Sequence, residues 1–520
     1  MIQEIVLYLS PQEASNDQSI RSHIAMEIGC RTNEIAGYTI LKKSIDARRR
    51  NVKIRLKLKA FIGEEAITAE SFLPRVQNVQ HKEPVLIAGA GPAGLFAALK
   101  LIEKGYKPLI LERGKDVRSR RRDLAQLNRT GIVHPDSNYC FGEGGAGTYS
   151  DGKLYTRSHK RGDIQEILQW FIYFGASENI AYEAHPHIGT NKLPKIISAM
   201  SDCIHACGGE VHFETKITDL LISNSAITGV KTTQGKIEGK HLILATGHSA
   251  RDIFELLEQK GISIEPKPFA LGVRIEHPQS LIDTIQYSCQ VRDPYLPPAS
   301  YSIVSQQLGK GVFSFCMCPG GIIAPASTAP GELVVNGWSP SRRNNPYANS
   351  GTVVTVDEKD FQAEGCTGVL AAMRYQQIVE RRAFEAGGGN LVAPAQRLTD
   401  FVAGKISQSL PDCSYVPSLR PAYLHEVLPK PVHDALQKAI VDFGKKMKGY
   451  YTHEAVMVAT ESRTSTPVRI PRDKFTLQHP QIKGLYPCGE GAGYAGGIVS
   501  AAMDGQRCAI AIAQNASHIP

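Results

Sequence analysis

The chain has 520 residues, of which 42% are hydrophobic and 21% are charged, and its formal net charge is +9. This composition is typical of globular proteins and excludes a fibrous or intrinsically disordered chain. The length predicts about two to four domains. The eleven cysteines show no zinc-binding spacing, and an odd number scattered along the chain indicates thiols rather than a disulfide framework. No metal site is predicted.

The N-terminus shows no basic segment followed by an apolar stretch, so no secretory signal is visible. The longest apolar run, from Val85 to Leu99, contains three glycines and is shorter than the ~20 residues that span a bilayer. We therefore expect a cytoplasmic protein without a membrane span.

Residues 1–75 predict a small α+β module, with strands over 2–9, 37–43 and 52–61 and a helix over 19–28. In the last strand apolar residues alternate with Lys53, Arg55, Lys57 and Lys59, so that one face is apolar and the other basic. A half-buried strand with a solvated face is the favoured interpretation. The alternative is a surface for nucleic acid or another anionic partner, which the lack of interleaved aromatic residues disfavours. Residues 73–83 are predicted to form a linker.

The strongest chemical signal is a glycine-rich turn between a predicted strand (85–88) and a predicted helix (93–104). It reads GxGxxG, and a second strand (108–111) leads to an acid 18 residues beyond the last glycine. The glycines allow a tight turn and let a pyrophosphate approach the helix N-terminus, and the acid accepts hydrogen bonds from a ribose. The predicted dinucleotide-binding residues are Gly89, Ala90, Gly91, Pro92, Ala93, Gly94, Glu112 and Arg113.

The rest of the chain predicts an α/β fold in which this dinucleotide domain is interrupted. A second helix–strand pair is expected near 192–207 and 210–213, followed by strands over 217–222, 226–232 and 236–244. Residues 266–450 are richer in Pro, Gly, Ser and Asn, and a further glycine-rich turn follows within 484–505. We therefore predict a Rossmann-type domain of residues 84–265 and 451–520, split by an inserted α+β substrate domain of residues 266–450.

Two distant segments resemble parts of the flavoprotein superfamily whose FAD domain is of the glutathione-reductase or glucose-inhibited-division type. They are HLILATG (241–247) and GLYPCGEG (484–491). The resemblance implies that the dinucleotide is FAD. It also implies that Thr246 and Gly247 lie beside the cofactor, that Gly489 and Glu490 contact its ribityl–pyrophosphate region, and that the backbone of Ile217 meets the adenine.

Two further glycine-rich stretches are expected at the flavin. In the first, Gly144, Gly145, Ala146 and Gly147 would let backbone lie against the ring, while Ser150, Asp151 and Lys153 offer polar groups. In the second, Gly497 and Ile498 open a predicted helix whose N-terminus would stabilise the negative charge of reduced flavin. The alternatives are a surface loop and a packing turn, respectively.

The motifs together resemble a family of uncharacterised bacterial FAD-dependent dehydrogenases that carry a small N-terminal α+β domain. The matching stretches are FGEGGAGTYSDGKL (141–154), CMCPGG (316–321), ESRTSTPVR (461–469) and GLYPCGEGAGYAGGI (484–498). The resemblance implies a flavoprotein and supplies no substrate.

Three residues are candidates for catalysis. Cys316 and Cys318 form a C-x-C pair that could exchange electrons with the flavin or shape a substrate pocket, but a buried, inert pair is the alternative. Arg463 could hold an anionic substrate or the flavin O2 atom, or form an ion pair with Glu461. The arginines that follow Glu112 predict either a solvated helix face or a grip on the extra phosphate of NADPH; they are Arg118, Arg120, Arg121 and Arg122.

The leading hypothesis is an FAD-dependent oxidoreductase that transfers hydride between flavin N5 and a small organic substrate, with NAD(P)H as a transient electron donor. One alternative is a flavin monooxygenase. The alternative of another class is a flavin-bound protein associated with nucleic acid through its basic N-terminal module. The substrate, the electron donor and the oligomeric state do not follow from the sequence.

Overall fold

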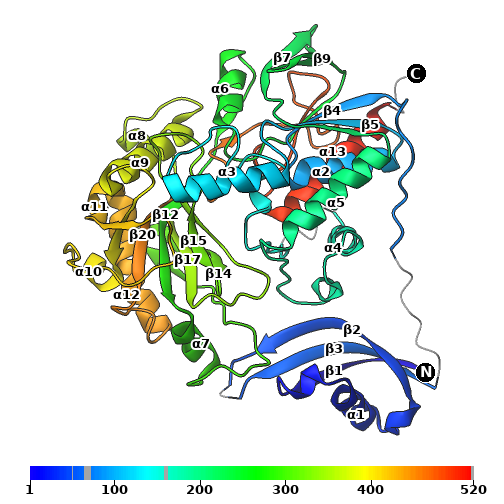
Figure 1. Ribbon diagram of the computed structural model, residues 1–520, viewed down its shortest axis with the longest axis vertical. Helices are drawn as coiled ribbons and strands as arrows, with labels where there is room; N and C mark the ends of the chain where they lie inside the picture. The colour runs from blue at the N-terminus through cyan, green and yellow to red at the C-terminus, as the bar shows by residue number, and fades with distance from the viewer. Residues whose placement is uncertain (50, 64–71, 157–161, 517–520) are drawn as a thin grey trace.

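Sheets built from distant parts of the sequence organise the chain (Figure 1). The computed structural model describes residues 1–49, 51–63, 72–156 and 162–516. Residues 50 and 64–71 of the predicted N-terminal module lie outside the described residues. Within the described part, no helix has both the length and the apolar character needed to cross a bilayer.

A five-stranded parallel sheet forms the centre of the nucleotide-binding region. Its order is β22–β10–β4–β5–β6, and every pairing in it is parallel. The strands are β4 (Pro84–Ala88), β5 (Lys107–Leu111), β6 (Glu210–His212), β10 (Leu242–Leu244) and β22 (Leu485–Pro487). The predicted α/β fold with a parallel sheet is confirmed.

Both faces of this sheet are covered, and for this reason its central strands are continuously apolar. In β4, Val85 and Ile87 pack against one core cluster, whereas Leu86 and Ala88 pack against another. The first cluster includes helices α2 (Pro92–Glu103), α5 (Leu193–Ala206) and α13 (Ile498–Ala516). The second includes α6 (Arg251–Gln259) and a three-stranded sheet of β7 (Ile217–Ser223), β8 (Ala226–Thr232) and β9 (Gly235–Glu238).

One predicted strand is wrong. Residues 236–244 form two strands in two different sheets, β9 and β10. The chain leaves the small sheet at Gly239, whose N–H donates to the Thr228 carbonyl at 3.0 Å, and enters the parallel sheet at Leu242. A glycine inside a strand pattern marks such a break.

A seven-stranded sheet lies beside the parallel one (Figure 1). Its order is β13–β14–β17–β12–β20–β18–β19, and all pairings except β18–β19 are antiparallel. The strands are β12 (Phe269–Pro278), β13 (Val304–Gln307), β14 (Lys310–Cys318), β17 (Tyr347–Val356), β18 (Ala393–Arg397), β19 (Leu419–Pro421) and β20 (Val456–Glu461). Helices α9 (Ala371–Gly387) and α12 (Lys430–Lys446) contribute to its core. Strand β20 lies past the predicted boundary at residue 450, and the domain boundaries stay predictions.

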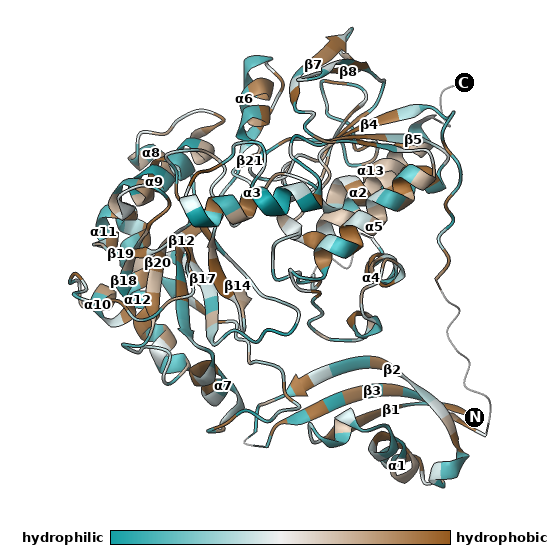
Figure 2. Cartoon of the chain, in the orientation of Figure 1, coloured by the Kyte–Doolittle hydropathy of each residue, from teal (hydrophilic) through white to brown (hydrophobic). Residues whose placement is uncertain are grey.

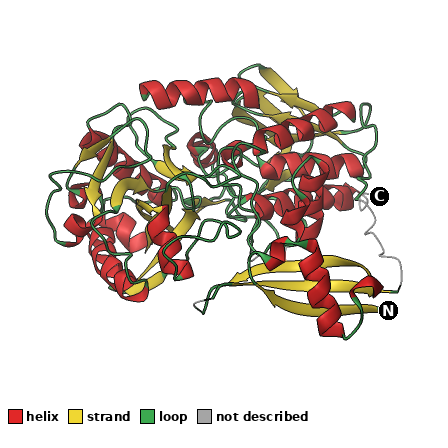
Figure 3. Cartoon of the chain, turned by 60° about the horizontal axis from the view of Figure 1, so that its bottom comes forward, coloured by secondary structure: helices red, strands yellow, loops and turns green. Residues whose placement is uncertain are grey.

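The N-terminal residues form a three-stranded antiparallel sheet of order β1–β3–β2 with one helix against it. The elements are β1 (Ile2–Leu9), α1 (Asp17–Ile28), β2 (Ile35–Asp46) and β3 (Lys53–Ile62), close to the predicted bounds. Figure 3, turned so that the bottom of Figure 1 comes forward, shows α1 in front of this sheet. The helix therefore covers the face of the sheet that points away from the rest of the molecule.

The arginine-rich segment after Glu112 is helix α3 (Val117–Thr130), which is largely hydrophilic (Figure 2). The predicted solvated helix face fits Arg118, Arg121 and Arg122, which are exposed. The prediction is wrong for Arg120, which is fully buried. Its guanidinium donates to the carbonyls of Asn138, Tyr139 and Glu143 at 2.8–2.9 Å. Arg120 thus fixes the loop that leads to the glycine-rich stretch 141–154.

Candidate functional site

A cavity of about 330 Å³ opens at the carboxyl ends of the parallel strands. It is lined by residues that directly follow these strands, among them Gly89, Glu112 and Ala245, and by Glu490. Ligands in open α/β sheets bind at this edge. The cavity also reaches β14 of the seven-stranded sheet, so its two walls come from two different sheets. We refer to it as the central cavity.

The central cavity brings together most of the residues that the sequence predicted for the site. Its lining contains Gly89, Gly91, Pro92, Ala93, Glu112, Arg113, Gly145, Ala146, Gly147, Ser150, Asp151, Lys153, Ile217, Thr246, Gly247, Cys316, Cys318, Arg463, Glu490, Gly497 and Ile498. Segments more than 300 residues apart in sequence thus share one surface.

Four predicted cofactor-binding residues do not line the central cavity; they are Ala90, Gly94, Gly144 and Gly489. They make backbone hydrogen bonds and close backbone contacts behind the cavity surface instead. The Ala90 carbonyl accepts from the Gly144 N–H at 2.8 Å, which ties the glycine-rich stretch to the first turn. The Gly489 N–H donates to the Asp504 carboxylate at 2.8 Å.

Two glycines of the first turn are required by close approach. Gly89 has φ of +100°, and a Cβ there would lie 2.6 Å from the Ala245 carbonyl oxygen. A Cβ on Gly94 would lie 2.0 Å from the Gly89 carbonyl oxygen. These contacts explain why the turn after β4, helix α2 and the Ala-Thr-Gly turn after β10 pack against each other.

The Glu112 carboxylate is buried and organises the turn around it. One oxygen accepts from the Ala90 N–H at 2.8 Å, and the other accepts from the N–H groups of Gly114 and Gly142 at 2.9 Å. A carboxylate has lone pairs beyond these three bonds, and Glu112 lines the cavity, so it can still accept from a ribose hydroxyl. Arg113 next to it stacks on Phe141 at 4.4 Å and pairs with Asp252.

The N-terminus of α2 is open to an anion. Its N-cap is Gly91, which has no side chain to cap the helix, and Pro92 follows as the first helical residue. The free N–H groups of the first turn therefore face the cavity lined by Gly91, Pro92 and Ala93. Gly145 approaches the same turn, since its Cβ would lie 3.1 Å from Gly91 Cα. This geometry suits a pyrophosphate.

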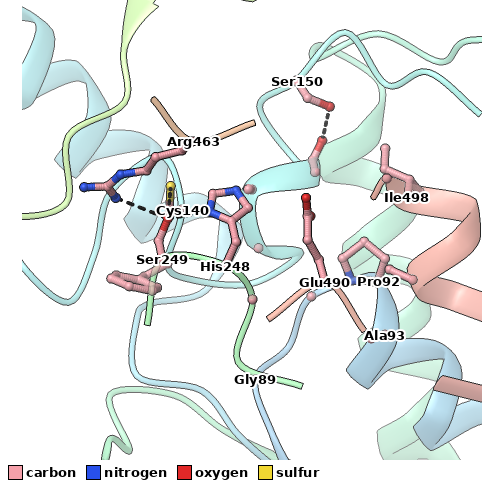
Figure 4. A pocket seen from close by; sticks show the side chains of 18 of the residues that line it. Gly89, Pro92, Ala93, Cys140, Ser150, His248, Ser249, Arg463, Glu490 and Ile498 are labelled. Carbon is pink, nitrogen blue, oxygen red and sulfur yellow. Dashed lines mark hydrogen bonds between the residues drawn. The ribbon is translucent and has the colours of Figure 1, made fainter. Parts of the chain in front are cut away.

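Glu490 and the first residues of α13, which come from the C-terminal part of the chain, also line the central cavity. Glu490 lies opposite the Arg463 and Ser249 side of the pocket, with His248 between them (Figure 4). Burial raises the pKa of Glu490 to about 7, although the charge of Lys267 lowers it. The Ser500 hydroxyl accepts from the Gly496 N–H at 3.1 Å, so the start of α13 is held by its own first turn.

The polar residues of the glycine-rich stretch face the second wall. Asp151 is 4% exposed and pairs with Arg343 at 2.6 Å, and Lys153 lies 3.9 Å from the same carboxylate. Burial would raise the pKa of Asp151, but Arg343 and Lys153 outweigh it and lower the pKa. The Lys153 ammonium also donates to the Met317 carbonyl, which links this stretch to β14. Ser150 Oγ donates to the Gly147 carbonyl at 2.8 Å.

Cys316 and Cys318 have different environments. A bulge in the β14–β17 pairing lies between Phe315 and Cys318, and Cys316 has φ of +43° there and is exposed where the cavity begins. Cys318 is buried. Burial raises the pKa of the Cys318 thiol, so Cys318 is a thiol and not a thiolate near neutral pH. The interpretation of a buried, inert pair therefore fits Cys318 and not Cys316.

Four of the five N–H groups of Arg463 are already bonded within the protein. It pairs with Glu380 through Nη2 at 3.0 Å and Nε at 3.2 Å, and its Nη1 donates to Thr328 and Ser249. The alternative of an ion pair with Glu461 is wrong, because Glu461 pairs with Arg274 at 3.3 Å instead. Residues two apart in a strand share a face, but β20 ends at Glu461, so strand alternation does not fix the direction of Arg463.

Sequence reasoning missed His248 and Ser249, which follow the Ala-Thr-Gly turn and line the cavity. Ser249 Oγ lies 2.8 Å from His248 Nδ1, accepts from Arg463 at 3.2 Å and lies 3.4 Å from Cys140 Sγ. Burial, together with Arg463 and Arg251, lowers the pKa of His248 to about 4, so its imidazole is neutral near pH 7. The only signal in the sequence was its position directly after that turn.

Comparisons with known proteins identify matching family models and relatives of this chain. Residues 268–464 match the family model described as "FAD-dependent protein, C-terminal domain-like", and residues 1–61 match a domain of unknown function, DUF8436. An uncharacterized protein from Clostridium beijerinckii is 38% identical over 511 residues, covering 94% of this chain and 95% of that protein. A thiamine thiazole synthase from Aeropyrum pernix is 25% identical over 185 residues, covering 32% of this chain and 56% of the synthase.

Two solved structures illustrate the more distant likenesses. The L-proline dehydrogenase from P. horikoshii is 13% identical with a TM-score of 0.34, and 84% of this chain and 94% of that chain are covered. The glycine oxidase from Bacillus cereus is 14% identical with a TM-score of 0.30, and 84% of this chain and 96% of that chain are covered. TM-scores this low support no statement about substrate or mechanism.

The residues around the cavity fit the cofactor that the family match implies. An open helix N-terminus at Gly91 suits a pyrophosphate, and a buried acid at Glu112 suits a ribose. The predicted cofactor, FAD, is confirmed, and the broad class of FAD-dependent oxidoreductase is supported without its reaction. By its identity over nearly the whole length, the chain belongs to the same family as the uncharacterized Clostridium beijerinckii protein.

Proposed function

We propose that the protein transfers hydride between FAD and a small organic substrate bound in the central cavity. The observation that carries the proposal is the second wall of the cavity. Beyond the predicted cofactor-binding segments, the lining continues to Cys316, Asn336 and His248, which a dinucleotide alone does not require. A site that holds only a nucleotide has no use for a wall built from another sheet.

The bound flavin would supply the redox chemistry. The residues of the chain hold it and shape the space next to it. We assign Gly91 to Ala93 to the pyrophosphate, Glu112 to the ribose and the N-terminus of α13, at Gly497 and Ile498, to the stabilisation of negative charge. Lys153, Asp151 and Ser150 lie where the glycine-rich stretch meets the second wall.

His248 is the best placed group for a proton or hydrogen bond at the substrate. Its ring lies in the cavity wall and is held at Nδ1 by Ser249, which Arg463 positions in turn. A neutral imidazole can accept a hydrogen bond from a substrate hydroxyl or amine at Nε2 while Ser249 fixes its orientation. We therefore assign substrate contact to His248 and a positioning role to Arg463.

An anaerobic titration tests the proposal. The purified holoprotein is mixed with NADH or NADPH, and bleaching of the visible flavin band is followed before oxidised metabolites are screened for reoxidation. We expect reduction by a nucleotide or by an organic donor, with transfer that does not consume oxygen. The proposal fails if the flavin is reoxidised only by oxygen in a substrate-stimulated reaction, which is the behaviour of a monooxygenase. His248→Gln should slow turnover with substrate while FAD content stays at the wild-type level.

A further inference from the structure

One face of the N-terminal sheet carries an excess of positive charge. Residues directly opposite each other in antiparallel strands lie on the same face of a sheet. Lys42 is opposite Lys57, and the alternation along β3 places its other basic residues on the same side. We call this side, formed by Lys42, Lys53, Arg55, Lys57 and Lys59, the cationic face.

Few carboxylates balance the cationic face. By register, Glu4 and Asp46 share it. Glu4 pairs with Lys57 at 2.7 Å, whereas Asp46 is bonded to Arg48 in the turn that follows. Within the residues that the structure describes, Lys42 and Arg55 have no ion pair. Glu4 neutralises Lys57, and the remaining like charges on this face repel each other, so a bound anion would relieve their repulsion.

The cationic face is directed toward the rest of the molecule. The opposite face of β3, with Ile54, Leu56 and Leu58, belongs to the same core as Ile20 and Ile24 of α1. Figure 1 shows α1 below the sheet and the remainder of the chain above it. The charged face is therefore turned toward the part of the molecule that contains the central cavity.

A short segment, 182–188, connects the N-terminal sheet to the cavity wall. At one end, the Lys43 N–H donates to the Tyr182 carbonyl at 2.8 Å, and the Ala184 N–H donates to the Lys43 carbonyl at 2.9 Å. At the other end, the Leu154 N–H donates to the Pro186 carbonyl at 2.9 Å. Strand β2 is thus linked by backbone hydrogen bonds to the stretch that places Lys153 in the cavity lining.

Cations from three parts of the sequence converge on His185 in this segment. Burial lowers the pKa of His185, and the charges of Lys42, Arg343 and Lys153 lower it further. The His185 ring lies 5.0 Å from the ring of Tyr155, which lines the central cavity. Asp151 is the shared partner of Arg343 at 2.6 Å and Lys153 at 3.9 Å, so one carboxylate faces two cations and a net positive charge stays on this group beside Lys42.

We propose that the substrate carries a multiply charged phosphate or carboxylate group, which Lys42, Lys153 and the cationic face bind while the remainder of the molecule enters the central cavity. This inference rests on the proposed function and names the substrate class. Phosphates and carboxylates share the chemistry that Lys and Arg recognise through charge-assisted hydrogen bonds. The N-terminal sheet then serves as the part of the enzyme that selects anionic substrates.

The test is calorimetric titration of the full-length, FAD-loaded protein with two probes, inorganic tripolyphosphate and citrate. We expect at least one probe to bind, with an affinity that falls as salt concentration rises. The probe that binds more tightly identifies phosphate or carboxylate as the recognised group. Lys42→Gln combined with Arg55→Gln should weaken binding at least about tenfold, as expected for the loss of about 1.4 kcal/mol. Lys153→Gln should also weaken it, since Lys153 joins the rim to the cavity.

Lys104→Gln is the matched control, because Lys104 is an exposed lysine at the end of α2 and should leave the affinity unchanged. The inference is overturned if neither probe binds, or if Lys153→Gln has no effect. It is also overturned if a single-stranded oligonucleotide binds the cationic face about 100-fold more tightly than tripolyphosphate, which would make the face a nucleic-acid surface. Flavin content and anaerobic reduction are measured on the same samples. Absence of probe binding to the unmodified protein, with normal flavin reduction, refutes this inference and leaves the proposed function standing.

Discussion

The two walls of the central cavity are built by different means. The wall at the ends of the parallel strands consists mainly of backbone, with Gly89 and Gly94 in close approach and Glu112 holding three N–H groups. The opposite wall depends on buried charge, since Arg463 in the cavity lining pairs with the fully buried Glu380. The first wall depends on close backbone approach, which leaves no room for added side chains, whereas the second depends on charged side chains that neutralise one another. Substitutions should therefore act on the first wall through space and on the second through charge.

The largest effect is expected in the buried network of the second wall. Glu380 is fully buried and pairs with Arg251 at 2.8 Å and Arg463 at 3.0 Å. Burial would raise the pKa of Glu380, but the two arginines outweigh it and lower the pKa. Glu380→Gln leaves only Glu332 to balance two arginines, so the free energy of unfolding should fall by about 3–5 kcal/mol. Denaturant unfolding of the FAD-loaded protein measures this change.

The control is Glu364→Gln, which breaks a partly exposed ion pair with Arg382 of 2.7 Å. Pairs of this kind contribute less than about 1 kcal/mol. If the Glu364 and Glu380 variants unfold at the same denaturant concentration, the network does not stabilise the second wall.

The next effect concerns pH and Glu276, which lies on β12 two residues after Arg274. Glu276 is 1% exposed and accepts from Ser414, and burial raises its pKa from the ordinary 4.5 to about 7. Between these values the folded protein keeps a proton that the unfolded chain has lost. The free energy of unfolding should therefore fall by about 3 kcal/mol as pH rises from about 4.5 to about 7. Glu276→Gln should flatten this part of the profile, and an unchanged slope in thermal unfolding across this range would contradict the assignment.

The smallest of the three effects is expected in the backbone wall. Gly94→Ala places a methyl group 2.0 Å from the Gly89 carbonyl oxygen, so α2 must shift away from the turn. Overpacking of this kind costs about 1–3 kcal/mol, and FAD affinity should fall about ten- to a hundredfold. Gly311→Ala is the control, since its Cβ would meet atoms at 3.5 Å and beyond. Fluorescence titration of apoprotein with FAD measures both variants, and equal affinities would show that the close approach at Gly94 is not needed.

The two walls also differ in what could be predicted from the sequence. The βαβ unit and its contribution to the cavity lining were predictable because GxGxxG, the helix start and Glu112 lie within one continuous stretch. The partner of Arg463 was not, because Glu380 reaches it from α9 and only packing decides between Glu380 and Glu461. His248 was not predicted because a single histidine after a turn belongs to no recognisable sequence motif. Arg120 was misinterpreted because an arginine-rich helix gives no sign that one guanidinium will be enclosed by backbone carbonyls.

The parallel sheet has a consequence for biosynthesis. Strand β10 ends at Leu244, but its neighbour β22 begins only at Leu485, so the ribosome must make 240 intervening residues before this edge is paired. During that time an apolar strand edge, Leu242 to Leu244, is open to wrong partners, and a chaperone that shields it would help the nascent chain. Glu490 and the start of α13, which line the central cavity, are made later still, so the cavity is complete only after β22 has been synthesised.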